Sequence, residues 1–473
     1  MVQPPLAARR AIVADDRGGL QPNVPATVRE LPLRFWIALV ATGVAAGLGA
    51  MAMMAVLRAV QHIAFDYRVG DYVAAVARHG DLWRIVVVGL GGAVAGIGWW
   101  VLRQKAGGTG GEPTAAVWTK RPDLSWWRTV ASSTLSEVVI GLGGSLGREA
   151  APQHVGAAAG STFGRRLGLT RDQRVLLVAC GAGAGVGAVY NVPLAGALFA
   201  AELYLGSLSL VAVVPALVAS AIATAVAWTT LPPHVLYRLA PTGFPSASMV
   251  IFALVAGPVL GVASAGYVRL IAWASDHRPT GWRLLVEPVA AFTVLGVAAI
   301  EYPLLLGNGR DLAQFAFGGT AVLATVAALA ALKPVMTALC LRSGASGGLF
   351  TPTFSFGAVL GLTLGHLWAM AWPGASLDTY AVIGAGAMIG TAMEAPVAGI
   401  AFTLELTGTT TVSLVVVALA LAGALLVSRQ LVSLSIYSAR IAKPTAPPFA
   451  TDAAPPPASP TSPDRPGEDR QAR

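Results

Sequence analysis

The chain contains an internal repeat, and this repeat limits its architecture more than any other feature. Residues 193–203 read PLAGALFAAEL and residues 396–406 read PVAGIAFTLEL, so proline, alanine, glycine, phenylalanine, glutamate and leucine recur at matching positions. A second pair of related strings precedes them in the same order, GSLG at 144–147 and GASG at 344–347. We infer two related halves, at about 31–230 and 240–442.

The composition indicates whether the surface of the folded chain is exposed to water or to lipid. Hydrophobic residues make up 55% of it and charged residues 12%, whereas soluble domains carry roughly 25% charged residues. The chain is therefore predicted to be an integral membrane protein with one membrane domain at 31–442. Residues 1–30 are polar and are expected to form a partly disordered cytoplasmic segment. The proline-rich residues 443–473 are expected to form a disordered tail.

The apolar segments fall into two classes of length. Long ones, each able to cross ~30 Å of hydrocarbon as a helix, are predicted at 34–58, 82–103, 209–230, 248–273, 285–305 and 413–428. Shorter ones, bounded by glycine and proline, lie at 124–141, 148–165, 173–189, 191–204, 320–341, 350–370, 378–392 and 395–407. Helices that stop part-way through a membrane are tolerated where their ends line a protected site. The predicted fold is all-α.

Charge is concentrated in short basic clusters between the apolar segments. The net charge is +9, and the clusters are Arg9–Arg10, Arg29 with Arg34, Lys120–Arg121, Arg165–Arg166 and Arg171 with Arg174. This distribution follows the positive-inside rule and excludes a nucleic-acid partner. We expect a multi-pass protein of the cell (inner) membrane with both termini cytoplasmic. The two cysteines lie in apolar runs, so neither a metal site nor a cofactor is predicted.

Each half also has an interrupted helix that begins with glycine and then proline. Gly147 to Pro152 opens one apolar segment, and Gly347 to Pro352 opens the other. A helix start presents unpaired N–H groups and the positive end of the helix dipole, which together favour an anion. One helix end contributes only ~0.3–2 kcal/mol, and an ion in the bilayer core costs at least several kcal/mol. Several ends must therefore converge.

On these motifs the chain resembles the CLC family of chloride channels, voltage-gated members among them, and Cl−/H+ antiporters. The family's GREGP-type motif resembles residues 147–151, its GxFxP-type motif resembles 348–352, and its GSGIP-type motif resembles 108–112 less closely. The resemblance implies an inverted repeat of about eighteen helical segments, several of them not spanning. It also implies a homodimer with one anion path per subunit, in a lipid bilayer and without CBS domains. A transporter of this kind is not an enzyme.

The resemblance also implies roles for individual residues. A central chloride would bind the hydroxyls of Thr109 and Tyr437 and the backbone N–H groups of Leu349 and Phe350. An outer chloride would bind near the backbone of Arg148, Glu149 and Ala150. The Glu149 carboxylate would be the gate, because it is itself an anion and can occupy a chloride site until a proton or chloride displaces it.

Plainer roles exist for several of these residues. Glu149 could only cap its own helix, and Arg148 could only pair with an acid such as Glu137. Glu202 and Glu405 occupy matching repeat positions, which favours a structural role for both where the halves pack. His154 and His366 are isolated on apolar segments and are expected to be packed rather than reactive.

The chain departs from the family pattern at positions that bear on mechanism. Thr109 stands where the family has serine, and the motif's proline is either replaced by Glu112 or shifted by one to Pro113. Ala150 and Ala151 replace the glycine and proline that follow the gate, with proline displaced to Pro152.

Leu203 occupies the position where proton-coupled members usually carry a second glutamate. Either Glu202, a water chain or another acid substitutes, or the coupling is weak or absent. We favour Cl−/H+ exchange, with a passive chloride channel as the alternative. Chloride is the favoured anion, and nitrate or bromide are expected to pass too.

An intramembrane serine protease of the rhomboid type is a remote alternative. Gly344 to Gly347 matches the GxSG string with Ser346 as nucleophile, and His366 lies in an apolar segment. A rhomboid does not require a duplicated chain, and the string consists of common residues. A Ser346→Ala variant should keep ion flux and would abolish proteolysis.

Overall fold

The computed structural model describes residues 30–68, 70–231, 233–239, 246–373, 376–409 and 411–441, which form helices and their connections. The predicted terminal segments lie almost entirely outside these residues. The longer helices are α2 (Leu33–Phe65), α4 (Asp81–Gln104), α6 (Trp126–Gly141), α7 (Ala150–Arg166), α8 (Arg171–Tyr190), α10 (Leu210–Ala227), α11 (Ala247–Asp276), α12 (Arg283–Glu301), α14 (Leu323–Arg342), α15 (Phe350–Ala371), α16 (Leu377–Met393), α17 (Pro396–Thr407) and α18 (Thr411–Leu431). The shorter elements are α3 (Tyr72–Ala77), α5 (Pro113–Trp118), α9 (Pro193–Phe199), α13 (Arg310–Phe317), a π-helical turn at Ala200–Tyr204 and 3-10 turns at Pro303–Leu305 and Ser438–Arg440.

The hydropathy pattern predicted most of these helices but misjudged the length of three. Among the described residues, nine helices are long and apolar enough to cross a membrane. They include α8, α14 and α15, which we had placed in the shorter class. Pro334 lies inside α14 without ending it. Short helices α3, α5 and α13 were not predicted, since six to eight residues carry little periodic signal.

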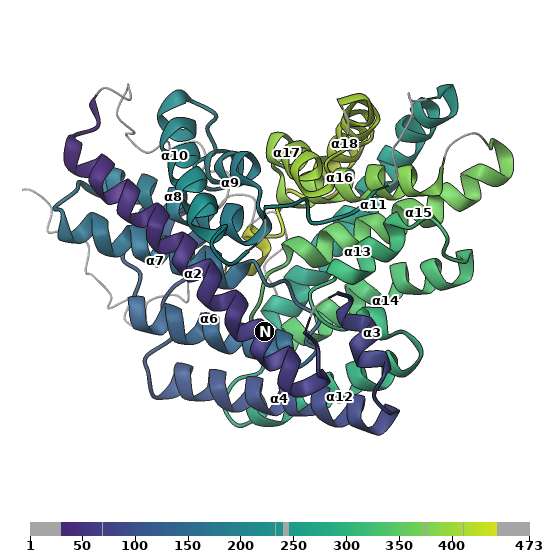
Figure 1. Ribbon diagram of the computed structural model, residues 1–473, viewed down its shortest axis with the longest axis horizontal. Helices are drawn as coiled ribbons and strands as arrows, with labels where there is room; N and C mark the ends of the chain where they lie inside the picture. The colour runs from purple at the N-terminus through teal and green to yellow at the C-terminus, as the bar shows by residue number, and fades with distance from the viewer. Residues whose placement is uncertain are drawn as a thin grey trace, which may run out of the picture. The chain divides into compact units, whose positions relative to one another are not determined.

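The two halves repeat the same helix contacts. In the first half α7 packs against α8 and α2 against α10; in the second half α15 packs against α16 and α11 against α18 (Figure 1). Glycines permit the closest pairs: a Cβ on Gly156 would lie 2.1 Å from the carbonyl oxygen of Gly181, and one on Gly357 would lie 2.5 Å from that of Gly384. Small residues that let helices approach in this way are typical of membrane interiors.

The halves also cap each other's helices through two glutamates. Both Glu202 carboxylate oxygens accept backbone hydrogen bonds at the start of α17, from Val397 at 3.2 Å and Ala398 at 2.7 Å. Glu405 does the same at the start of α9, with Leu194 at 3.2 Å and Ala195 at 2.6 Å. α9 and α17 lie next to each other at the middle of Figure 1. Each half therefore satisfies backbone donors of the other.

Removal of either reciprocal cap should destabilise the protein. We expect Glu405→Ala and Glu202→Ala each to lower stability by about 1–2 kcal/mol, the usual loss on deleting a helix-capping side chain. Thermal unfolding in detergent, monitored by circular dichroism, would measure this. Glu301→Ala, at the exposed last residue of α12, is a suitable control. Unchanged melting of both variants would contradict the capping role.

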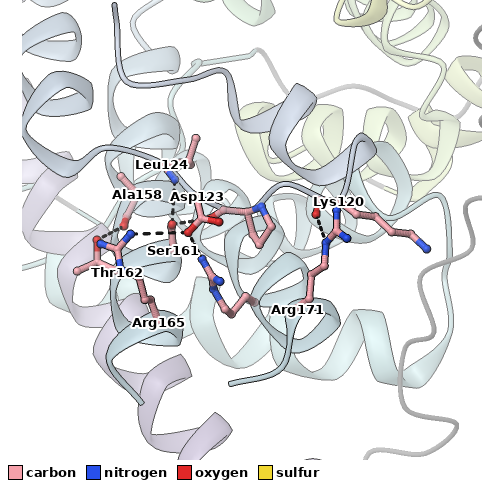
Figure 2. A network of polar contacts seen from close by, with 10 residues as sticks. Lys120, Asp123, Leu124, Ala158, Ser161, Thr162, Arg165 and Arg171 are labelled. Carbon is pink, nitrogen blue, oxygen red and sulfur yellow. Dashed lines mark hydrogen bonds and ion pairs between the residues drawn. The ribbon is translucent and has the colours of Figure 1, made fainter. Parts of the chain in front are cut away.

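Cations gather at one end of α7 and α8, which we call the basic end; it contains Lys120, Arg121, Arg165, Arg166, Arg171 and Arg174. Figure 2 shows the connection between α5 and α6 held there. Asp123 contacts Arg165 at 3.7 Å and also pairs with Arg174. The Ser161 hydroxyl accepts a hydrogen bond from Leu124 N–H at 3.0 Å. α7 runs 17 residues from Ala150 to this end, a length of about 25 Å.

Candidate functional site, an anion pocket occupied by a carboxylate

The two interrupted helix starts meet in the folded chain. Gly147 and Gly348 form an isolated antiparallel bridge in which each N–H donates to the other's carbonyl oxygen at 2.7 Å. The starts of α7 and α15 follow directly after these glycines. The convergence of helix ends that the repeat predicts is therefore present, and a pair of backbone hydrogen bonds fixes it.

Glu149 projects from the start of α7 into the start of α15. Its Oε1 accepts a hydrogen bond from Phe350 N–H at 2.7 Å, and its Oε2 accepts from the hydroxyls of Tyr190 at 2.9 Å and Thr351 at 3.1 Å. The residue is 1% exposed. Three donors without a formal charge thus hold a buried carboxylate at the positive end of a helix dipole.

The partners of Glu149 lie on two helices other than its own, α8 and α15. Glu149 stands at the N-cap position of α7, yet its side chain makes no capping hydrogen bond there. The plainer role, in which the carboxylate caps its own helix, is therefore not what the structure shows. The side chain instead crosses from the first half of the chain to the second.

Two glycines make room for this crossing. A Cβ on Gly348 would lie 1.7 Å from Glu149 Oε1, and a Cβ on Gly147 would lie 2.3 Å from Oε2. Both separations are far shorter than van der Waals contact, so any side chain at Gly348 would exclude the carboxylate. The glycines of both motifs are therefore required for the observed position of Glu149.

Tyr437 presents a buried hydroxyl that no protein group satisfies among the described residues. The residue is 5% exposed, and its ring lies 5.7 Å from that of Phe199. A buried hydroxyl without a partner costs about 1–3 kcal/mol, which favours an acceptor from outside the protein, such as an anion.

Arg148 lies near the gate but does not pair with Glu137. Its guanidinium stacks over the Tyr190 ring at 5.2 Å, and its buried Nε has no hydrogen-bond partner. Both carboxylate oxygens of Glu137 also lack partners, and that residue is fully buried. Within the described part of the chain, the expected structural pair is not formed. Leu349, at the N-cap of α15, and Ala150, at the start of α7, lie at the two helix starts as predicted.

Thr109 is less well placed than the resemblance implies. α5 begins at Pro113, and Glu112 is its N-cap residue. A motif whose proline opens a helix therefore aligns on Pro113, which puts Gly110 rather than Thr109 at the serine position. Thr109 is half-buried, and its hydroxyl makes no hydrogen bond within the described residues.

Sequence reasoning missed two ligands of the gate and one ion pair. Thr351 lies inside the second motif, where its hydroxyl was a visible signal, but Tyr190 ends α8 and carried none. His154, which we expected to be merely packed, lies 3.6 Å from the Glu112 carboxylate. This contact was not predicted, because the position of His154 on an apolar helix did not reveal an acid on a loop 42 residues earlier.

The residues of the protease alternative lie far apart. Ser346 precedes α15, and its carbonyl oxygen accepts a hydrogen bond from the Ser136 hydroxyl at 2.8 Å. His366 lies sixteen residues after the first residue of α15, about 24 Å along the helix axis. No Ser346–His366 dyad can form, so the protease alternative is wrong.

Comparisons with known proteins agree with this geometry. Residues 91–429 match a family model described as voltage gated chloride channel. A putative ClcB-like chloride channel protein of Ralstonia nicotianae is 30% identical over 71% of this chain and 80% of its own length. A H(+)/Cl(−) exchange transporter, ClcA, of Vibrio campbellii is 26% identical over 76% of this chain and 79% of its own length.

Solved structures share the fold at low sequence identity. A slow cyanobacterial Cl−/H+ antiporter superposes with a TM-score of 0.75 at 20% identity, covering 86% of this chain and 97% of that one. A CLC-type fluoride/proton antiporter superposes with a TM-score of 0.71 at 21% identity, covering 88% of this chain and 99% of that one. The predicted all-α inverted-repeat fold is confirmed.

Proposed function

Because this chain belongs to the voltage-gated chloride channel family, the CLC family, we propose that it carries chloride across the cell membrane in exchange for protons, with Glu149 as the gate. The observation that carries this proposal is the binding of the Glu149 carboxylate by Phe350 N–H and by the hydroxyls of Tyr190 and Thr351. This pocket already binds an anion that belongs to the protein itself.

The chemistry of the pocket suits chloride as well as carboxylate. Its donors are one backbone N–H, two hydroxyls and the dipole of α15. Partial charges of this kind stabilise an anion without holding it as tightly as an ammonium or guanidinium would, and rapid passage needs such moderate affinity. The unpartnered Tyr437 hydroxyl supplies a further donor for a second anion, together with Leu349 N–H. Thr109 contributes to this central position only if its loop moves.

Exchange follows if the binding of chloride and the protonation of Glu149 are linked at the same pocket. When Glu149 is ionised it fills the pocket, and chloride must displace it. When Glu149 takes up a proton, it loses its charge and its strong hydrogen bonds to the three donors. Each release of the pocket by protonation therefore favours chloride entry, which links the two ions. The passive-channel alternative is supported by Leu203, which cannot carry a proton, and by relatives named as channels.

Flux measurements on proteoliposomes distinguish these two modes. We expect an outward chloride gradient to drive protons against their own gradient, detected by a pH-sensitive dye while a chloride electrode records efflux. Chloride efflux without proton movement would support the channel, and absence of both would refute transport. Bromide and nitrate should also pass, since the donors recognise charge rather than halide size.

The assembly and orientation follow from the same proposal. A homodimer with one complete pathway in each subunit is expected from the family to which the chain belongs. The basic end is assigned to the cytoplasmic side by the positive-inside rule, so the gate lies toward the opposite side of the membrane. No cofactor takes part.

A further inference from the structure

Proton exchange, if it operates as proposed above, requires a route between Glu149 and the basic end. Glu149 is buried at one end of α7, and the basic end, which we assigned above to the cytoplasmic side, is the other. The two residues at the position where proton-coupled relatives usually carry the proton-transferring glutamate, Glu202 and Leu203, do not provide this route. Leu203 has no titratable group, and both oxygens of Glu202 are held by backbone N–H groups of α17.

Glu112 and His154 form a titratable pair in this region. His154 Nε2 lies 3.6 Å from Glu112 Oε1, and the two side chains are 14% and 32% exposed. The pair is thus mostly enclosed but still accessible to solvent. His154 follows Glu149 by five residues on α7, which is about 7.5 Å along the helix axis. His154 and the gate therefore share helix α7.

The surrounding charges decide which member of the pair carries the proton. Glu112 lies outside the membrane-spanning helices. Desolvation raises its pKa, but the nearby His154, Arg440 and Arg278 together outweigh this and lower the pKa to about 2. Glu112 therefore stays ionised, as a fixed counter-charge. The imidazole of His154 has two ring nitrogens that can each donate or accept a hydrogen bond, so His154 is the member of the pair to which we assign proton transfer.

Two tyrosines offer hydroxyls for the route. The Tyr204 hydroxyl accepts a hydrogen bond from Gln153, the neighbour of His154. The rings of Tyr204 and Tyr437 both pack against Phe199, with centroids 5.5 and 5.7 Å from its ring centroid. Each hydroxyl can accept one proton while it donates another.

We propose that His154, held by the Glu112 carboxylate, transfers protons between the cytoplasmic solution and Glu149. The neutral imidazole takes a proton from water and becomes imidazolium beside Glu112. It then passes a proton through the Tyr204 and Tyr437 hydroxyls, or water between them, to the Glu149 carboxylate. The imidazole returns to neutral as Glu149 becomes a carboxylic acid, and the same steps run in reverse. His154 thus performs the proton transfer that Leu203, which has no titratable group, cannot perform.

The test compares His154→Gln and Glu112→Gln with the unmodified protein in proteoliposomes. Glutamine cannot carry a proton, so we expect His154→Gln to reduce proton flux about a hundredfold or more, the usual contribution of a positioned proton-transfer group, while chloride flux continues. Glu112→Gln should shift the dependence of proton flux on cytoplasmic pH toward lower pH, since the imidazolium loses its counter-charge. His366→Gln is the matched control, because His366 lies on α15 and, among the described residues, bonds only the Leu362 carbonyl oxygen.

The possible results distinguish a failure of the proposed role of His154 from a failure of the proposed chloride–proton exchange. Unchanged proton-to-chloride coupling in His154→Gln would overturn the role of His154 while leaving exchange intact. Chloride flux without protons in the unmodified protein would overturn exchange itself. If His154→Gln fails to fold, the reciprocal variant with Glu112→His and His154→Glu keeps the pair, and it should retain coupled proton flux. A folded, chloride-conducting reciprocal variant that moves no protons would also count against the proposal.

Discussion

Substitution of Glu149 by glutamine should abolish proton movement while chloride flux continues. The amide keeps the shape of the carboxylate but neither exchanges a proton at physiological pH nor attracts the dipole of α15. Hydrogen bonds to a charged group contribute about 1.5–3 kcal/mol each, and about 1.4 kcal/mol corresponds to a factor of ten. Losing the charge from three such bonds should therefore reduce occupancy of the pocket by the side chain at least tenfold.

The control for this variant is a second buried glutamate on a neighbouring helix. Glu137 on α6 is fully buried, and neither of its oxygens has a hydrogen-bond partner in the part of the chain that the structure describes. Glu137→Gln should leave both ion fluxes close to those of the unmodified protein. Simultaneous chloride and pH recording measures both variants. Proton uptake that survives in Glu149→Gln would remove Glu149 from the gating role.

Substitution of Gly348 by alanine should open the gate without altering Glu149. The added methyl carbon would lie 1.7 Å from Glu149 Oε1, and Gly348 is not among the glycines with a positive φ. The alanine backbone is therefore acceptable, and the carboxylate is the group that must move. We expect chloride flux to become uncoupled from protons, with at least a tenfold rise in chloride ions moved per proton, as for the loss of the pocket hydrogen bonds.

A glycine in open space is the control for the Gly348 variant. A Cβ on Gly266, in α11, would meet nothing within 4 Å, so Gly266→Ala should transport as the unmodified protein does. A Gly348→Ala protein that keeps normal coupling would show that the observed position of Glu149 is not needed for exchange. A structure of that variant would also show whether the carboxylate has left α15.

The sequence was sufficient for the fold because the fold depends on periodic and repeated features. Apolar runs located α2, α4, α10, α11, α12 and α18, and the duplicated PLAGALF-type segments paired α9 with α17. Placing α8, α14 and α15 in the class of shorter helices was wrong. The glycines of α8 and α15 end no helix but admit a neighbouring backbone, as Gly181 and Gly357 do. A glycine that packs and a glycine that ends a helix look alike in sequence.

The site was only partly predictable from the sequence, because some of its contacts are local and others join elements that are distant in the chain. Helix starts are local features, so Gly147, Glu149, Phe350 and their anion-binding donors could be named from motifs. Tyr190 reaches the gate from the far end of α8, and Glu112 reaches His154 from a loop; both contacts depend on how distant elements pack. Such pairings leave no periodic trace in a single sequence.

The bond between Glu149 and Phe350 also has a consequence for the order in which the chain is made. The two residues are 201 positions apart, so a ribosome that has completed the first half has produced the gate but none of its α15 ligands. Until the second half enters the bilayer, that carboxylate has no pocket to close. A nascent first half therefore cannot leak chloride through this pathway. The α15 donors that form the anion site and the binding of the Glu149 gate to them appear together, when the second half folds.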